Sequence, residues 1–442
     1  MFRNSAKDLL SIMTLLCVAA AMQLTPAHGA PVSTLSPKDR AKILDDVWKD
    51  VRDRYYDPEF HGVDWDAVGE KYRPLVATTQ SDDDFYALVN RMTGELHDAH
   101  TRFNTPGQWE NHKKEQTFTI GFLMTEKDGK MVVNDVYPDS TAAHDGVEPG
   151  MIVTTVNGEP MADQIAESAK TTSTSSTDRI TRARIYANVF RGGADASFQI
   201  GFQRPDGSTL QVTLSKQTLQ RPADARAKLL PSGNLYIRFD GFQKPVQEEF
   251  KKSLEDYKDA PGLIIDLRQN GGGRSDILTS IAGDFFNSNT VLAEFQTRKD
   301  VSHEESSGST KELRKMMAGA VGGQLYAGPI VILTDEYTAS SSEIFAGGLQ
   351  ETGRAKVVGT QSCGCVIGIA NNQKMKGGGV LEISEVLFFT PKGRKLEGEG
   401  VIPNVVIAPA VADLQQKRDV ALEEAENVLK RMGASSPVSN GK

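Results

Sequence analysis

The sequence has no cluster of basic residues, and it has only one long apolar run. Its net charge is −8, which argues against nucleic acid as a partner. The apolar run, Leu9 to Leu24, lies near the N-terminus, and no later run is long enough to span a bilayer. The glycine-rich stretches lack a following Gly-Lys-Ser or Gly-Lys-Thr, which argues against a Walker-type phosphate site.

Cysteine and histidine are also scarce, with three and seven residues of these types among 442. Cys17 lies in the apolar run, so Cys363 and Cys365 remain as a pair. Thiols this close can be free, joined in a tight bridge, or packed as small apolar side chains. A nucleophilic thiol at Cys365 is a further alternative. His97 and His100 could form a metal pair or a helix-end pair, but no cysteine or third histidine stands nearby, so no metal or cofactor is expected.

Residues 1–29 have the pattern of a secretory signal peptide. Arg3 and Lys7 precede the apolar run, and small residues follow it at Ala27, Gly29 and Ala30. This pattern predicts cleavage near Gly29 and a periplasmic or secreted protein, and an uncleaved anchor is the alternative.

A small-residue turn with three serines stands directly before an apolar-periodic helix. The run Pro329 to Thr334 is β-branched and predicts a buried strand, and Ser340, Ser341 and Ser342 follow it. A strand, a tight turn and a helix expose a hydroxyl at a helix N-terminus, where negative charge is favoured. Ser340 is therefore a candidate nucleophile. The same residues also fit a helix cap, because Glu343 lies three residues after Ser340.

A second strand, Gly262 to Arg268, leads into Gly271, Gly272 and Gly273 before another helical pattern. Backbone N–H groups of such glycines can approach a ligand and stabilise an oxyanion. Gly271, Gly272 and the N–H of Ser341 are the predicted oxyanion donors.

Together these segments resemble the S41 family of serine peptidases, which contains the carboxyl-terminal-processing (tail-specific) proteases and their tricorn-core relatives. The resemblance covers nearly all of the chain after the leader. It rests on Asp98-Ala99-His100-Thr101, Thr119-Ile120-Gly121-Phe122, Asp266-Leu267-Arg268 with the three glycines, the Ser340 turn, and the segment Glu397 to Asn404.

The resemblance implies an α/β multidomain fold. We expect a helical N-terminal domain over residues 30–115, a PDZ-like β domain over 116–217, and a crotonase-like or ClpP-like α/β catalytic core over 218–411. A C-terminal helix, residues 412–432, and a tail to residue 442 complete the chain. The helical patterns Asp39 to Tyr56 and Ser81 to Leu96 place His100 at the end of a helix.

The resemblance also implies the catalytic residues. The Ser/Lys branch has a lysine base 25 residues after the nucleophile, where this chain has Cys365. In the tricorn-like branch the base is a histidine supported by a serine and a glutamate, which correspond to His100, Ala99 and Glu397. An imidazole accepts a serine proton more readily near neutrality than a solvated lysine does. Because position 99 carries no hydroxyl, Glu397, Asp98, a water or a backbone carbonyl must orient the imidazole.

Lys374 and Lys376 are the alternative bases. Glu351, 11 residues after Ser340, stands where some processing proteases carry a supporting aspartate.

The PDZ-like resemblance implies a site for peptide tails. Backbone groups of Ile120, Gly121 and Phe122 are expected to bind a C-terminal carboxylate, with the peptide added as a strand. An occluded, purely structural β module is the alternative.

The sequence thus predicts an exported serine endopeptidase that acts on proteins or peptides. The competing hypothesis is a catalytically inactive protein that binds peptide tails or apolar ligands on the same fold. Homo-oligomers are possible through the C-terminal helix, and no membrane insertion is expected after signal cleavage.

Overall fold

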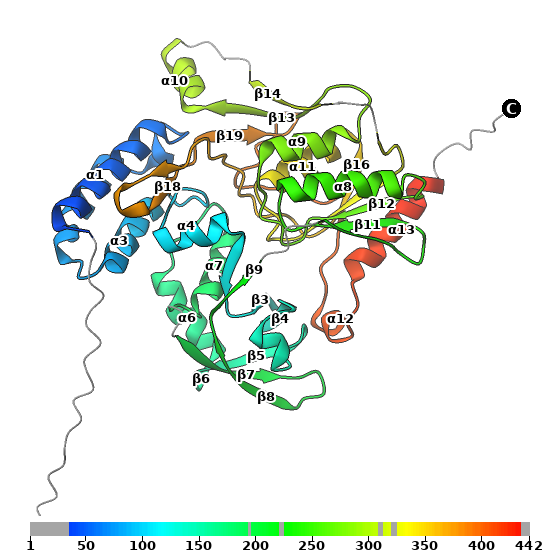
Figure 1. The fold of residues 1–442 in the computed structure, drawn as a ribbon, viewed down its shortest axis with the longest axis horizontal. Coiled ribbons are helices and arrows are strands. Elements are labelled where there is room, and N and C mark those ends of the chain that lie inside the picture. The colour runs from blue at the N-terminus through cyan, green and yellow to red at the C-terminus, as the bar shows by residue number, and fades with distance from the viewer. Residues whose placement is uncertain (1–34, 193–195, 221–224, 308–312, 320–324, 435–442) are drawn as a thin grey trace, which may run out of the picture.

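The computed structural model describes residues 35–192, 196–220, 225–307, 313–319 and 325–434, which form three regions (Figure 1). The predicted signal peptide and the tail after residue 434 lie outside these ranges. Within the described residues, none of the helices combines the length and the apolarity that crossing a bilayer requires.

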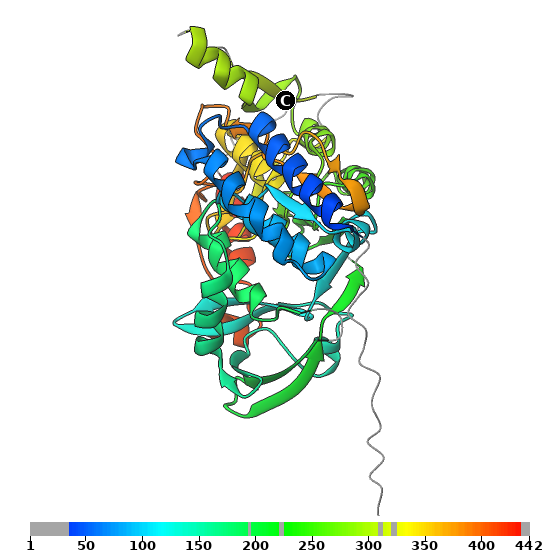
Figure 2. The same cartoon turned by 90° about the vertical axis from the view of Figure 1, so that its left-hand side faces the viewer.

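The first region is helical, and its helices stack beside the rest of the chain (Figure 2). Its elements are α1 (Pro37–Arg54), η1 (Phe60–Gly62), α2 (Trp65–Tyr72), η2 (Arg73–Thr78), α3 (Asp82–Gly94), β1 (Arg102–Asn104) and α4 (Pro106–Lys113). Ser81 caps α3 in a capping box with Asp84. The two predicted helices are confirmed as α1 and α3. Because α3 ends at Gly94, His97 and His100 lie just after the helix rather than on it.

The second region, called here the β region, contains residues 116–220. Its main sheet has the order β3-β4-β5-β7-β8, so β3 is an edge strand. The strands are β3 (Phe122–Lys127), β4 (Lys130–Val136), β5 (Ile152–Val156), β7 (Ser197–Gln203) and β8 (Thr209–Ser215), with β6 (Glu159–Pro160) on β5 and a separate pair of β2 (Gln116–Thr119) and β9 (Gln217–Gln220). The helices are α5 (Thr141–His144), α6 (Met161–Thr171) and α7 (Asp178–Asn188).

The third region, the α/β region, is built on a six-stranded sheet of order β10-β11-β12-β15-β16-β20. All neighbouring strands are parallel except β10 and β11. The strands are β10 (Arg226–Leu229), β11 (Leu235–Arg238), β12 (Leu263–Asp266), β15 (Ile330–Thr334), β16 (Ala355–Gly359) and β20 (Val405–Val406).

Helices cover both faces of this sheet. Ile332 points to a core that includes α8 (Lys244–Asp256), α9 (Ser275–Gly283) and α11 (Ser341–Glu351). The neighbouring residue Val331 packs instead against α13 (Val420–Ala434). A strand buried on both faces explains why β12 and β15 are continuous apolar runs rather than alternating ones.

Two small sheets complete the fold, and the first of them joins two regions. One has the order β1-β18-β17, with β17 (Gln373–Lys374) and β18 (Val380–Glu382), and it ties the helical region to the α/β region. The other consists of β14 (Arg314–Ala318), β13 (Thr290–Thr297) and β19 (Val386–Phe389). The remaining elements are α10 (Arg298–Ser307), η3 (Lys376–Gly378) and α12 (Val411–Gln415).

The predicted single C-terminal helix is wrong, because the chain turns between α12 and α13. Lys417 has a φ of 56°, and Asp419 accepts a hydrogen bond from the N–H of Leu422 at 3.0 Å, which starts a new helix. The carboxylate of Asp419 also pairs with Arg268 at 2.8 Å. These bonds fix the break in the helix.

Candidate active site

Ser340 lies at the sharp turn between β15 and α11. Its backbone has φ 58° and ψ −123°, a conformation that is unusual for a residue with a side chain. The side chain makes no capping hydrogen bond to the helix. The N–H of Ser340 instead donates to the carbonyl of Cys365 at 2.9 Å and to Glu343 Oε2 at 3.1 Å. The turn therefore holds the backbone of Ser340 rigidly and leaves its hydroxyl out of the helix cap.

Glu343 holds this turn from inside the protein. Its side chain is fully buried. Oε1 accepts bonds from Ser362 Oγ at 2.5 Å and from the N–H of Gly364 at 2.7 Å, and Oε2 accepts from the N–H groups of Ser340 and Cys365 at 3.1 and 3.0 Å. Burial raises the pKa of Glu343 to about 7, against the opposing effect of these bonds. The sequence indicates Glu343 only as a helix-cap partner and gives no local sign of its burial.

The glycine run packs directly on the Ser340 turn. A Cβ at Gly272 would lie 2.7 Å from the Cβ of Ser340, so only glycine fits there. The N–H of Gly272 donates to Asn270 Oδ1 at 2.9 Å, so this predicted oxyanion donor is already engaged. The N–H groups of Ser341 and Gly271 donate to no acceptor among the described residues. These two remain available to a ligand.

His100 follows α3 in an irregular segment that Asp98 shapes. Oδ1 of Asp98 accepts the N–H groups of His100 and Thr101 at 2.7 and 2.6 Å, and also the hydroxyl of Ser384 at 2.9 Å. The Nδ1 atom of His100 is buried without a hydrogen-bond partner among the described residues. Burial, with the nearby charge of Arg102, lowers the pKa of His100 to about 4, which keeps the imidazole neutral.

His100 and Ser340 line the same cleft, which has a volume of about 1580 Å³. Gly271, Gly272 and Ser341 line it as well. No hydrogen bond joins His100 to Ser340 in the described part of the chain. Such catalytic contacts are often long without substrate and shorten when it binds.

Glu397 lies behind this cleft rather than in its lining. It is 6% exposed, and Oε2 accepts the N–H of Val366 at 2.6 Å. Burial raises the pKa of Glu397 to about 7, and a hydrogen bond from the Ser176 hydroxyl opposes that rise. Ser176 has no signal in the sequence, because it lies about 220 residues before Glu397 in a serine-rich and threonine-rich stretch of the β region.

The alternative bases lie elsewhere. Lys374 and Lys376 are exposed and do not line the cleft. Lys376 also pairs with Asp39 at 2.7 Å. Glu351 accepts the N–H of Lys392 at 3.0 Å, which is a structural contact.

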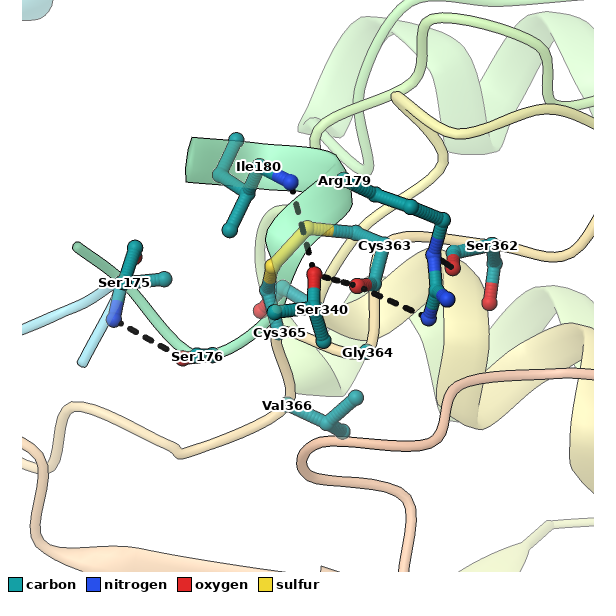
Figure 3. The surroundings of a disulfide bond; sticks show 12 residues. Ser175, Ser176, Arg179, Ile180, Ser340, Ser362, Cys363, Gly364, Cys365 and Val366 are labelled. Carbon is teal, nitrogen blue, oxygen red and sulfur yellow. Dashed lines mark hydrogen bonds between the residues drawn. A yellow bond between two sulfur atoms is a disulfide. The ribbon is translucent and has the colours of Figure 1, made fainter. Parts of the chain in front are cut away.

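Cys363 and Cys365 form a disulfide, which removes a thiol nucleophile from consideration (Figure 3). The pair is buried with Ala99, Ile180 and Ala339, so segments of all three regions meet there. The disulfide lies beside Ser340 in the figure.

The predicted tail-binding residues lie at the start of β3, next to the cleft. Ile120 and Phe122 are buried. The N–H of Gly121 donates to Thr119 Oγ1 at 3.1 Å, and its carbonyl accepts the Ser140 hydroxyl at 3.1 Å. The following residue, Leu123, lines the cleft.

Across the described ranges, acidic, cysteine and histidine side chains form no group of three or more that could hold a metal ion.

Two family models match the chain. Residues 234–407 match Peptidase family S41, and residues 36–94 match the Tricorn protease C1 domain. The first match contains Ser340 and Glu397, and the second ends shortly before His100.

Curated relatives and solved structures agree with these matches. Carboxyl-terminal-processing peptidase 3, chloroplastic, of Arabidopsis thaliana is 23% identical, over 92% of this chain and 78% of the relative. A probable CtpA-like serine protease of Staphylococcus aureus (strain N315) is 24% identical, over 85% of this chain and 67% of the relative. The crystal structure of mature CPAF has the same fold, with a TM-score of 0.68 at 14% identity, over 91% of this chain and 99% of that one.

The relatives are named as peptidases, so the alternative of an inactive binding protein is not favoured. Residues 234–407 therefore form a region of peptidase family S41, and the enzyme class is that of the serine-type peptidases.

Proposed function

We propose that this protein is an exported endopeptidase in which Ser340 is the nucleophile and His100 is the general base. The observation that carries the proposal is the Ser340 turn, with its uncapped hydroxyl and two unengaged N–H groups in the cleft that His100 lines. A nucleophile, a base and oxyanion donors are the parts that acyl transfer needs.

The reaction begins when a peptide carbonyl enters the cleft. Ser340 Oγ attacks the carbonyl carbon while His100 takes the hydroxyl proton. The N–H groups of Ser341 and Gly271 stabilise the resulting oxyanion, and the N-terminus of α11 adds its partial positive charge. When the intermediate collapses, His100 returns the proton to the leaving amine. Water then attacks the acyl-enzyme by the same route and releases Ser340.

The neutral state of His100 suits this role, because only the unprotonated imidazole can accept a proton. Its lowered pKa keeps it unprotonated throughout the neutral range. We assign Glu397, which is buried outside the cleft lining, as the acidic residue that supports it.

We also propose that the β region is a PDZ-like domain that binds substrate tails along β3. Because β3 is an edge strand, a peptide can add to the sheet there. Part of this edge is engaged, since Tyr337 Oη donates to the carbonyl of Met124 at 3.3 Å and Thr125 Oγ1 donates to Glu336 at 3.2 Å. A bound tail would replace the hydrogen bond between Tyr337 and Met124. Tyr337 lies three residues before Ser340 in the chain.

The site of action follows from the predicted signal peptide. A disulfide persists in oxidising compartments, so the Cys363–Cys365 bond supports an exported enzyme that acts on exported proteins.

Hydrolysis of β-casein by the mature chain tests the proposal, with Ser340→Ala and His100→Ala beside it. We expect cleavage by the wild type and a loss of at least about 1000-fold in each variant. Lys374→Ala is the matched control and should cleave at the wild-type rate. Activity that is retained in Ser340→Ala would refute the assignment of the nucleophile. Activity that is retained in His100→Ala but lost in Ser340→Ala would show that another group is the base.

A further inference from the structure

The loop between α6 and α7, residues 172–177, lies against the segment that carries His100. The hydroxyl of Ser176 accepts the N–H of Ala99 at 3.0 Å. The carbonyl of Ala99 accepts a bond from Arg184 Nη2 at 3.1 Å. Both backbone groups of the residue before His100 are therefore held by the β region.

A second contact strengthens the connection between the loop and this segment. Thr174 Oγ1 and His97 Nδ1 are 2.6 Å apart and form a hydrogen bond. The segment is thus fastened three residues before His100 as well as one residue before it.

The Ser176 hydroxyl also reaches the buried glutamate. While its oxygen accepts from Ala99, its hydrogen is free to donate, and its partner is the carboxylate of Glu397. Glu397 in turn accepts the N–H of Val366 at 2.6 Å, next to the disulfide. Ser176 is therefore the group that joins the histidine segment to Glu397.

His100 needs such support from its surroundings. Its buried Nδ1 has no partner in the described part of the chain, and no direct bond connects the ring to Glu397. Residue 99 is an alanine, whose methyl group packs beside the disulfide and cannot donate a hydrogen bond. The position of the ring must then come from its backbone, which Ser176 holds.

We propose that Ser176 is a positioning residue for His100 and that it supplies, from the β region, the hydroxyl that residue 99 lacks. It fixes the backbone of Ala99 and directs the Glu397 carboxylate toward the histidine segment. When His100 takes the Ser340 proton, the ring stays in place through the Ala99 backbone, and Ser176 holds Glu397 in one orientation. This inference rests on the proposed roles of Ser340 and His100.

Steady-state kinetics on a fluorogenic peptide taken from a casein cleavage site test the inference. We expect Ser176→Ala to lower kcat by about 10-fold with KM nearly unchanged, the size of one lost hydrogen bond to a charged group. Ser176→Thr keeps the hydroxyl and should retain most of kcat. Ser175→Ala is the matched control, because the Ser175 hydroxyl in the same loop is buried without a partner among the described residues, and it should leave kcat unchanged.

A double-mutant cycle with Glu397→Gln separates positioning from simple loss of packing. If Ser176 acts through Glu397, the double variant is no slower than Glu397→Gln alone. The inference would be overturned if the loss of kcat in the double variant equals the product of the two single losses. An unchanged kcat in Ser176→Ala would also overturn it. A wild type that shows no Ser340-dependent cleavage would instead refute the proposed function.

A loss in Ser176→Ala counts only if the variant is folded, which its thermal unfolding midpoint reports. If Ser176→Ala does not fold, the kcat of Ser176→Thr tests the inference. A wild-type kcat supports the need for the hydroxyl. A loss of kcat as large as that of Glu397→Gln contradicts that need.

Discussion

Ser340 owes its conformation to a buried carboxylate three residues away in the chain. A positive φ at a serine costs on the order of 1–3 kcal/mol. Glu343 offsets this cost by accepting bonds from both sides of the turn, from Ser340 itself and from the segment Ser362 to Cys365. The Ser340 turn and the disulfide segment are thereby joined through one side chain.

Replacing Glu343 by glutamine tests this role. An amide nitrogen in place of one oxygen would face two donors, so we expect Glu343→Gln to lower the free energy of unfolding by about 2–5 kcal/mol. Urea unfolding at pH 7 measures the change. Glu423→Gln, an exposed substitution on α13, is the control and should be nearly neutral.

The pH dependence of stability gives a second readout on the same variant. Because the pKa of Glu343 is raised from 4.5 to about 7, the folded protein binds more protons than the unfolded chain between these values. The contribution of Glu343 to the free energy of unfolding therefore falls as the pH rises from about 4.5 to about 7. Glu343→Gln should remove this component of the slope, and an unchanged slope would show that Glu343 is ionised across that range.

At the scale of elements, the helix that begins after Ser340 is held by aromatic packing. Phe345 on α11 is fully buried and packs against Phe242 at a ring distance of 5.5 Å and against Phe285 at 6.4 Å. Phe242 precedes the glycine run, and its N–H donates to the carbonyl of Gly272 at 2.8 Å. The two halves of the oxyanion site are therefore packed on each other.

We expect Phe345→Ala to destabilise the protein by about 3–5 kcal/mol, through the cavity it leaves. Ile402 is 53% exposed, and Ile402→Ala should change stability by less than about 0.5 kcal/mol. Thermal unfolding of both variants checks the difference. Equal midpoints would contradict the claim that α11 is anchored through Phe345.

The sequence was sufficient to predict local elements with strong periodicity or clear caps. The strands at Leu263–Asp266 and Ile330–Thr334 were predicted from apolar runs, and the start of α3 from Ser81 and its acidic followers. The break before Asp419 was missed, because it depends on Arg268, 151 residues away. A tertiary ion pair of this kind leaves no local signal.

The same limit applies to the candidate site. Ser340 and His100 could be named from motifs that resemble the family, and the structure places both in one cleft. The contacts of Ser176 with Ala99 and Glu397 could not be predicted from the sequence, because these partners are 77 and 221 positions away in the chain. The sequence does not distinguish the hydroxyl groups of a Ser/Thr-rich loop, and only the fold determines which of them contacts a distant residue.

At the scale of the whole molecule, three regions converge on the cleft. The helical region provides His100, the β region provides Leu123, and the α/β region provides Ser340. Figure 1 shows the three regions side by side. The β region is further tied to the C-terminal turn, where Gln415 Nε2 donates to the carbonyl of Gly150 at 3.3 Å. Movement of the β region therefore bears directly on the candidate catalytic residues.

Tail recognition by the β region makes a prediction at this scale. Peptides with a free C-terminal carboxylate should be cleaved with a KM about 10-fold lower than the same peptides with an amidated C-terminus. The kcat values should be similar if the tail contributes binding alone. Equal KM values for both forms would contradict carboxylate recognition at β3.

The identity of the nucleophile is the central claim, and covalent labelling tests it most directly. The mature protein is treated with a fluorophosphonate, which reacts with activated serines, and the modified residue is located by peptide mass spectrometry. The account predicts one adduct, on Ser340, that forms much more slowly in His100→Ala. An adduct on Ser341 or Ser342, or no adduct on a folded protein that cleaves casein, would contradict it.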